Sequence, residues 1–207
     1  MPDAEDARRY HHGDLRRVLL EAAVASIRES GPAALSLREL ARRAGVSHAA
    51  PAHHFRDKRG LLTAVATEGF ERLAATLRAA YEATNSFAEV GVAYVRFAVE
   101  ERPFFDVMFR PELYDPDDPG IAAARLASGA MLYGPAATVS DHPLEAGVAA
   151  WSLMHGLATL GLAGNLPPAL GGDLEAVARA VAGHLFQAPR QGEAVARPPN
   201  EKNKKKR

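Results

Sequence analysis

The chain has 207 residues, enough for one or two domains with a buried core. It contains no cysteine, which excludes disulfides, thiolate nucleophiles and cysteine-ligated metal centres, and its charged N-terminus lacks the apolar segment of an export signal, so a cytoplasmic protein is expected. Lys/Arg and Asp/Glu balance at 25 each, but residues 1–80 carry a net charge of +3, residues 81–187 of −8 and residues 188–207 of +5, which predicts separate roles for these parts.

Four helices are predicted in the first 80 residues. Apolar residues recur three and four positions apart over residues 14–30, the spacing of one buried helical face, and a Gly-Pro pair ends that helix. Ser36 and Glu39 have the spacing of a capping box, Ser47 is expected to cap a third helix, and Asp57 a fourth. The expected helices cover residues 14–30, 36–44, 47–55 and 57–77.

The rest of the chain is also predicted to be helical, and prolines separate the predicted helices. The expected helices are 87–101, a short piece at 104–109, 121–139, 144–164 and 174–186. No run alternates in the manner of a β-strand, so the predicted fold class is all-α. Residues 188–207 contain few apolar side chains and are expected to be disordered.

Residues 146–164 contain no Asp, Glu, Lys or Arg, and this allows two interpretations. The segment is close to the length of a membrane span. It also fits a helix that is buried by its own domain and by a second copy of the chain. The second interpretation is favoured, because there is a single candidate span, it contains His155, and no flanking Lys or Arg would fix its orientation.

Two short helices around Gly45-Val46 have the layout of a helix-turn-helix unit. Gly45 can adopt the positive φ that the turn needs, and Val46 can fill the angle between the helices. Residues 36–60 carry a net charge of +4, which suits contact with DNA phosphates. A solvated charged face would look the same, but the combination with the helix-turn-helix spacing favours DNA binding.

The same segments resemble the tetracycline-repressor (TetR) family of transcription regulators. The matching strings are Tyr10-His11-His12-Gly13-Asp14-Leu15-Arg16, Leu35-Ser36-Leu37-Arg38-Glu39-Leu40-Ala41, Ala44-Gly45-Val46-Ser47, His54-Phe55, and Asp57-Lys58 with Leu61-Leu62. Trp151 with His155-Gly156 resembles the ligand domain of the subgroup named for Trp, His and Gly. The resemblance implies a three-helix DNA-binding domain, joined by a fourth helix to a helical domain for ligand binding and dimerisation.

The resemblance also implies a set of DNA-binding residues: Ser36, Arg38, Ser47, His48, Ala49, Ala50, His53, His54 and Lys58. Residues 48–50 match positions that face bases, while Ser36, Arg38, Ala52, His53 and Lys58 match positions at phosphates. This chain departs from the family at Ala52, where Tyr is usual, and at His53, where close relatives often have Arg. DNA binding is therefore expected to be weakened at two phosphate contacts, and Pro51 is expected to make the start of this helix irregular.

The C-terminal half is rich in aromatic residues and methionine, a composition that suits an adaptable apolar cavity as well as an ordinary core. The family resemblance implies a cavity for a small, apolar effector. The candidate effector-binding residues are Phe97, Phe104, Phe105, Met108, Phe109, Tyr133, Trp151 and His155. The two C-terminal helices are expected to pair with their copies in a homodimer, the last one through Leu174, Val177, Ala178, Val181 and Leu185.

No catalytic, cofactor or metal site is predicted. His48 and His53 are five residues apart and cannot chelate as an i, i+4 pair, and no phosphate loop or nucleophile motif is present. The expected parts are a flexible arm (1–13), the DNA-binding domain (14–60), the ligand-binding and dimerisation domain (61–187) and a basic tail (188–207). The predicted function is a ligand-responsive regulator, most simply a repressor that binds a palindromic operator as a homodimer. The alternative is a ligand-binding or interaction dimer of the same fold that binds DNA weakly.

Overall fold

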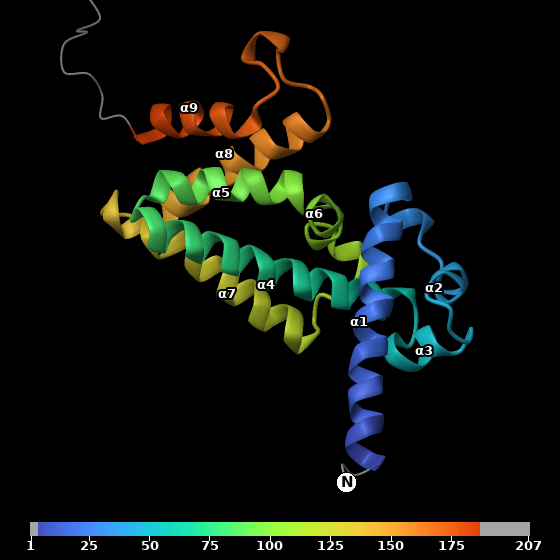
Figure 1. Ribbon diagram of the computed structural model, residues 1–207. Helices are drawn as coiled ribbons and strands as arrows, with labels where there is room; N and C mark the ends of the chain where they lie inside the picture. The colour runs from blue at the N-terminus through green and yellow to red at the C-terminus, as the bar shows by residue number, and fades with distance from the viewer. Residues whose placement is uncertain (1–3, 187–207) are drawn as a thin grey trace, which may run out of the picture.

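The computed structural model describes the backbone of residues 4–186 and the side chains of residues 15–184. Within this part of the chain the structure is all-α and has no β-strand, as predicted (Figure 1). The α-helices are, in chain order, α1 (Ala4–Ser30), α2 (Leu37–Arg43), α3 (Ala50–Phe55), α4 (Lys58–Thr84), α5 (Phe87–Glu100), α6 (Arg102–Met108), α7 (Pro119–Tyr133), α8 (Pro143–Leu162) and α9 (Leu174–Phe186). The expected basic tail, residues 188–207, lies outside the described residues.

The helices form two bodies that are connected by α4 (Figure 1). In the smaller body, α2 and α3 lie beside α1, and the three helices pack around Leu19, Ala23 and Ile27 of α1. Leu40 of α2 and Phe55 of α3 are buried in the same core. Every helix of this body therefore contributes apolar side chains to one small core, which fixes α3 relative to α1.

Helix α4 is 27 residues long and belongs to both bodies. Its first turn is capped by the Asp57 carboxylate, which accepts a hydrogen bond from the Gly60 N–H at 2.8 Å, as the sequence predicted. Leu61 and Leu62 pack toward the small body, and Phe70, Leu73 and Leu77 are buried farther along the helix. One continuous helix thus carries contacts to both bodies.

The larger body is built around α5, which is buried on most sides. It packs against α4, α8 and α9, and α7 covers the other side of α4 (Figure 1). An ion pair between the Arg179 guanidinium of α9 and the Glu89 carboxylate of α5, at 2.9 and 3.0 Å, holds the last helix in place. The hydrogen bonds from Arg179 lower the pKa of Glu89.

Besides the end of α4, which lies at Thr84 and beyond the predicted stripe, three helix boundaries differ from the prediction. Helix α1 begins at Ala4 instead of Asp14, so residues 4–13 of the expected flexible arm are helical. This stretch is rich in Ala, Glu and Arg, which favour a helix without the apolar periodicity on which the prediction relied. Helix α7 ends at Tyr133, because the following Gly134-Pro135 breaks it, and the chain continues as a 3₁₀ turn at Pro135–Thr138.

The third difference concerns α3, which begins at Ala50 and not at Ser47. Pro51 has no N–H group and is tolerated only in the first turn of a helix, so the helix cannot extend back to Ser47. The Ser47 carbonyl instead accepts a hydrogen bond from the Ala50 N–H at 3.0 Å and closes a turn ahead of the helix. The expected cap at Ser47 is therefore wrong, and the irregular start expected from Pro51 is present.

The predicted partner face of α9 is wrong in part. Val177 and Ala178 are buried in the chain's own core, where α9 packs on α5. An apolar stripe shows that a helix is buried but not against which neighbour.

None of the helices in the described part of the chain, α8 included, is long and apolar enough to cross a membrane.

Candidate DNA-binding and ligand-binding sites

The turn between α2 and α3 has the geometry that the sequence predicted. Gly45 has φ +67°, a value that L-residues with side chains rarely adopt, and it follows directly after the C-terminus of α2. The Val46 N–H donates to the Ala41 carbonyl at 3.0 Å, and the Val46 side chain is half-buried against the core. This arrangement sets α3 at an angle to α2, so that one side of α3 can face outward.

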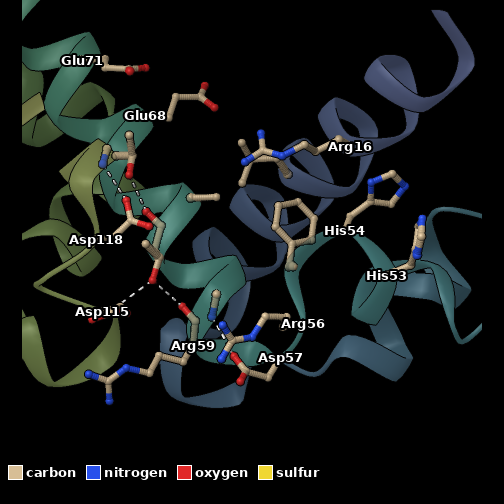
Figure 2. Close-up of a pocket in the computed structure, with 17 residues that line it drawn as sticks. Arg16, His53, His54, Arg56, Asp57, Arg59, Glu68, Glu71, Asp115 and Asp118 are labelled. Atoms are coloured by element: carbon tan, nitrogen blue, oxygen red, sulfur yellow. Dashed lines mark hydrogen bonds between the residues drawn. The ribbon is translucent and has the colours of Figure 1, made fainter. Parts of the chain in front are cut away.

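Helix α3 buries one face and exposes the other. Pro51 and Phe55 are buried, whereas Ala52 and His53 are exposed and His54 is half-buried (Figure 2). The residues of the preceding turn, Ser47, His48 and Ala49, are exposed, and Ala50 is half-buried. The expected base-facing residues 48–50 thus lie together at the N-terminal end of α3, the end that enters a major groove in helix-turn-helix proteins.

Part of the basic cluster is neutralised within the protein. Arg42 donates two hydrogen bonds to Glu39, at 2.8 and 2.7 Å, and Arg43 contacts Glu39 at 3.1 Å and Glu29 at 2.7 Å. The hydrogen bonds from Arg42 and Arg43 lower the pKa of Glu39 to about 2. Because Glu39 holds these arginines, the cation of α2 that remains available for a phosphate is Arg38, which is exposed.

Ser36 and Lys58, two residues expected to contact phosphates, differ in the contacts that they make within the chain. Ser36 precedes α2, but its side chain makes no cap hydrogen bond, and the Glu39 carboxylate contacts the two arginines, so the predicted capping box is not formed. The Lys58 ammonium donates to the Ala33 carbonyl at 2.7 Å and ties the start of α4 to the 3₁₀ turn at Pro32–Ala34. The ammonium has three N–H donors, so Lys58 can keep this bond and still donate to a phosphate within its reach.

The connection between α3 and α4 is tight. Arg56 has φ +66° and ψ −61°, and the Asp57 N–H donates to the Phe55 carbonyl at 2.8 Å, which is a γ-turn with a positive φ. A Cβ at Gly60 would overlap the Phe55 carbonyl oxygen, so glycine is required there. The angle between α3 and α4 is therefore set by backbone contacts.

In the larger body, three polar side chains form a hydrogen-bonded chain in an apolar environment. The Trp151 Nε1–H donates to the Tyr94 hydroxyl at 3.1 Å, and that hydroxyl lies 2.8 Å from Nδ1 of His155. The hydroxyl can accept from Trp151 and at the same time donate to Nδ1 when neutral His155 carries its proton on Nε2, so the direction of this second bond depends on the imidazole tautomer. Burial raises the pKa of Tyr94 and lowers that of His155, so both are uncharged at neutral pH.

Four of the eight predicted effector-binding residues meet at this chain. The His155 ring lies 4.7 Å from that of Phe109, 5.3 Å from that of Phe105 and 6.2 Å from that of Trp151, measured between ring centroids. The cluster joins α5, α6 and α8. Tyr94, which links its polar atoms, was not among the predicted site residues, although a buried tyrosine hydroxyl usually requires a hydrogen-bond partner.

The other four predicted effector-binding residues lie elsewhere in the packed body. Phe97, Phe104 and Met108 are at most 2% exposed and belong to the core, while Tyr133 packs against Gly147 of α8. A small cavity of about 10 Å³ lies beside Trp151 and Tyr94, room for about one water molecule. Its other lining residues are Phe87, Ala88, Val90, Gly91, Leu132, Gly147, Ala150 and Met154.

The described residues contain no group of three or more His, Asp or Glu side chains that could hold a metal ion. His53 and His54 lie next to each other on α3 with their rings 5.4 Å apart, and their place on this surface suits contact with DNA (Figure 2).

Two sequence families match the chain. Residues 19–65 match the family described as "Bacterial regulatory proteins, tetR family", and residues 87–185 match the family described as "Tetracyclin repressor-like, C-terminal domain". The HTH-type transcriptional regulator BetI of Yersinia pestis (strain Pestoides F) is 47% identical over 49 residues, which are 24% of this chain and 25% of that regulator. The match thus spans about a quarter of the length of this curated relative.

Solved structures share the fold over most of the chain. A protein with unknown function from Rhodococcus sp. RHA1 is 36% identical, with a TM-score of 0.73 over 86% of this chain and 96% of that one. The TetR family transcriptional regulator PfmR from Thermus thermophilus is 25% identical, with a TM-score of 0.64 over 81% of this chain and 96% of PfmR.

Proposed function

The chain belongs to the TetR family of transcription regulators, which are not enzymes, and from this premise we propose that it is a repressor that binds a palindromic operator as a homodimer and is released by a small, apolar effector. Residues 14–60 are assigned to DNA binding and residues 61–187 to ligand binding and dimerisation. The proposed location is the cytoplasm, where such a repressor meets DNA.

The observation that carries this proposal is the exposed N-terminal end of α3. His48 and Ala49 are exposed, while Pro51 and Phe55 anchor the helix in the core. Exposed cations lie on the neighbouring elements, with Arg38 on α2 and with Arg56 and Arg59 just after the C-terminal end of α3. Base-facing groups on a fixed helix, flanked by cations for the phosphates, are what sequence-specific recognition in a major groove requires.

The exposed half of α8 supports the homodimer. Leu144 is 60% exposed, Val148 43%, Leu153 37% and Leu160 47%, and Glu145 is the one Asp, Glu, Lys or Arg of this helix. In a single chain, this apolar face would stand in water. A two-fold dimer through α8 would cover it and place two copies of α3 for two half-sites, about 34 Å or a multiple of this distance apart.

The aromatic cluster supports an effector site in the larger body. The cavity beside Trp151 has little volume, but Met154 lines it, and an unbranched methionine side chain can move to admit a ligand. The cluster includes Phe105 of α6, and α6 packs against α1 of the small body. A ligand that repacks this cluster would thus shift the population toward an arrangement with lower operator affinity.

The test is binding of the purified protein to the DNA upstream of its own gene over a series of salt concentrations. We expect affinity to fall steeply with salt, because phosphate contacts release counterions, and Arg38→Ala combined with Lys58→Ala to reduce the slope by about two. The matched control is Arg78→Ala together with Arg110→Ala, both exposed and outside the small body. Affinity that is indifferent to salt and to the first pair of substitutions would contradict the proposal.

A second candidate function is a dimer of the same fold that binds a ligand or a protein and has low affinity for DNA. It is favoured by Ala52 and His53, which replace residues that contact phosphates in relatives. Ala52→Tyr with His53→Arg distinguishes the two candidates. A gain in DNA affinity of about a hundredfold or more would indicate that the native surface is impaired, whereas a small change favours the repressor.

A further inference from the structure

A cleft of about 570 Å³ separates the two bodies (Figure 2), and the functions proposed above give no role to its interior, although His53, His54, Arg56 and Arg59 at its edge belong to the DNA-facing side of α3 and its junction with α4. Its volume lies in the range of small-molecule sites. One wall consists of α1 and α3, with Arg16, His54 and Phe55. The opposite wall consists of α4 and the start of α7, with Glu68 and Glu71 facing the gap.

The two walls differ in charge. Arg16 and the neighbouring histidines make the first wall a donor surface, and the Arg16 guanidinium points across the gap (Figure 2). The second wall carries Glu68 and Glu71 one helical turn apart on α4. Asp118 also lines it, but its carboxylate caps α7 through the Gly120 and Ile121 N–H groups at 2.8 and 3.2 Å.

These opposite charges do not pair with each other. Arg16 lies over the Phe55 ring, with Cζ 5.2 Å from the ring centroid, and it has no ion pair with Glu68 or Glu71. Glu68 accepts two hydrogen bonds from Arg72 of its own helix, at 2.8 and 2.6 Å. Glu71 has no hydrogen bond or ion pair with any residue of the described part of the chain. Arg16 and Glu71 thus face the same gap from opposite walls, while Arg56 and Arg59 line the cleft where α3 joins α4.

We infer that this cleft binds a small zwitterion, whose cationic group lies beside Glu71 and whose anionic group lies beside Arg16. A planar guanidinium already stacked on an aromatic ring is well suited to a carboxylate, because its two N–H edges are pre-oriented. A ligand with a single charge would pair with the charged side chain on one wall and leave the charged side chain on the opposite wall unpaired. The site therefore selects for both charges at a fixed separation.

Such a ligand would also bridge the two bodies and fix the angle between them. This effect rests on the proposed function: operator DNA and the zwitterion would alter each other's affinity by the same factor. Binding of the zwitterion does not depend on the effector site at Trp151 or on DNA, so it is measurable without either.

The experiment is isothermal titration of the full chain with ω-amino acids of increasing length, from glycine to 8-aminooctanoate. Each probe is compared with the alkanoate and the alkylamine of the same length. We expect one length to bind at least about tenfold more tightly than both singly charged analogues, and Arg16→Gln and Glu71→Gln each to remove this advantage. Arg78→Gln, an exposed change on α4 that does not line the cleft, is the control and should leave it intact.

The proposal is overturned if no ω-amino acid binds more tightly than its singly charged analogues, or if the advantage persists in both variants. Circular dichroism of each variant verifies that it is folded, and two variants on opposite walls guard against the failure of one of them. If the wild type binds its operator but no zwitterion, this site alone is refuted, whereas a wild type that binds the zwitterion but no operator refutes the proposed function alone.

Discussion

At the scale of single residues, the Tyr94 hydroxyl connects α5 to α8 in the larger body. It is the shared partner of Trp151 on one side and His155 on the other, so it satisfies two polar groups of α8 from α5. A polar chain of this kind in an apolar environment is stabilising only while each member has its partner.

Tyr94→Phe should therefore lower the free energy of unfolding by about 1 to 3 kcal/mol, because it leaves two half-buried groups without a partner. Urea denaturation measures the change, and Trp151, the single tryptophan of the chain, reports it by fluorescence. Tyr81→Phe is the matched control, since no hydrogen bond to the Tyr81 hydroxyl is found among the described residues. Equal effects of the two substitutions would contradict the role of Tyr94.

His155 gives a prediction about pH. Burial lowers the pKa of His155 in the folded protein, whereas in the unfolded chain it is about 6.5. The unfolded state therefore binds a proton more readily, and stability is complete above about pH 6.5 and falls as pH decreases toward the folded-state pKa. The groups around His155, namely Tyr94, Phe105, Phe109 and Trp151, do not titrate in this range.

Urea denaturation of the wild type between about pH 5 and 7.5 should show this slope, and His155→Gln should reduce it. His184→Gln, an exposed change on α9, is the control. The same slope in the wild type and in His155→Gln would show that His155 is not the responsible group.

Some residues of this cluster could be predicted from the sequence and others could not. Trp151 and His155 could be chosen because they belong to a recognisable string, whereas Tyr94 is one of several aromatic residues with no local signature. Which rings meet depends on how α5, α6 and α8 pack, and periodicity along one helix contains no information about its partners. For the same reason Phe97, Phe104 and Met108 could not be distinguished from cavity residues before their core positions were known.

At the scale of elements, the helices were predictable wherever a chemical signal marks their ends. Asp57 caps α4 as expected, and α9 has the predicted bounds. The start of α3 was not predicted, since Ser47 is a good cap by type but Pro51 decides where the helix can begin. A single proline, which has no backbone N–H group, thus outweighs a favourable capping residue.

Also at the scale of elements, Thr63 of α4 is hydrogen-bonded to Asp115 of the loop that precedes α7. The buried Thr63 hydroxyl of α4 donates to the Arg59 carbonyl at 2.8 Å and accepts from the Asp115 N–H at 3.0 Å (Figure 2). It therefore holds the loop between α6 and α7 against the first turns of α4, which follow directly after α3.

Thr63→Val keeps the shape of the side chain and removes both bonds. We expect a loss of about 1 kcal/mol in the free energy of unfolding and faster hydrogen exchange at the Asp115 amide. Thr67→Val is the matched control, because the Thr67 hydroxyl bonds to the Thr63 carbonyl of its own helix. If the Asp115 amide exchanges at the same rate in both variants, this loop is held by other contacts.

At the scale of the whole molecule, the exposed face of α8 should decide the oligomeric state. Val148→Arg with Leu160→Arg places two charges on this face, and burying them in a dimer would be costly, so the protein should become a monomer. Light scattering coupled to size-exclusion chromatography measures the mass. The control is Leu126→Arg on α7, where the native leucine is 77% exposed. A dimer that survives the α8 changes, or one that Leu126→Arg also dissociates, would place the interface elsewhere.

The central claim is that the N-terminal end of α3 lies against bases of the operator. The most direct measurement is photo-cross-linking from p-benzoylphenylalanine at position 49, with the same group at position 126 of α7 as the control, in complexes with operator DNA. The account predicts cross-links to bases at two sites related by a two-fold axis and separated by about one helical turn or a multiple of it, from position 49 alone. Bound DNA that does not cross-link to position 49, or that cross-links equally to position 126, would contradict it.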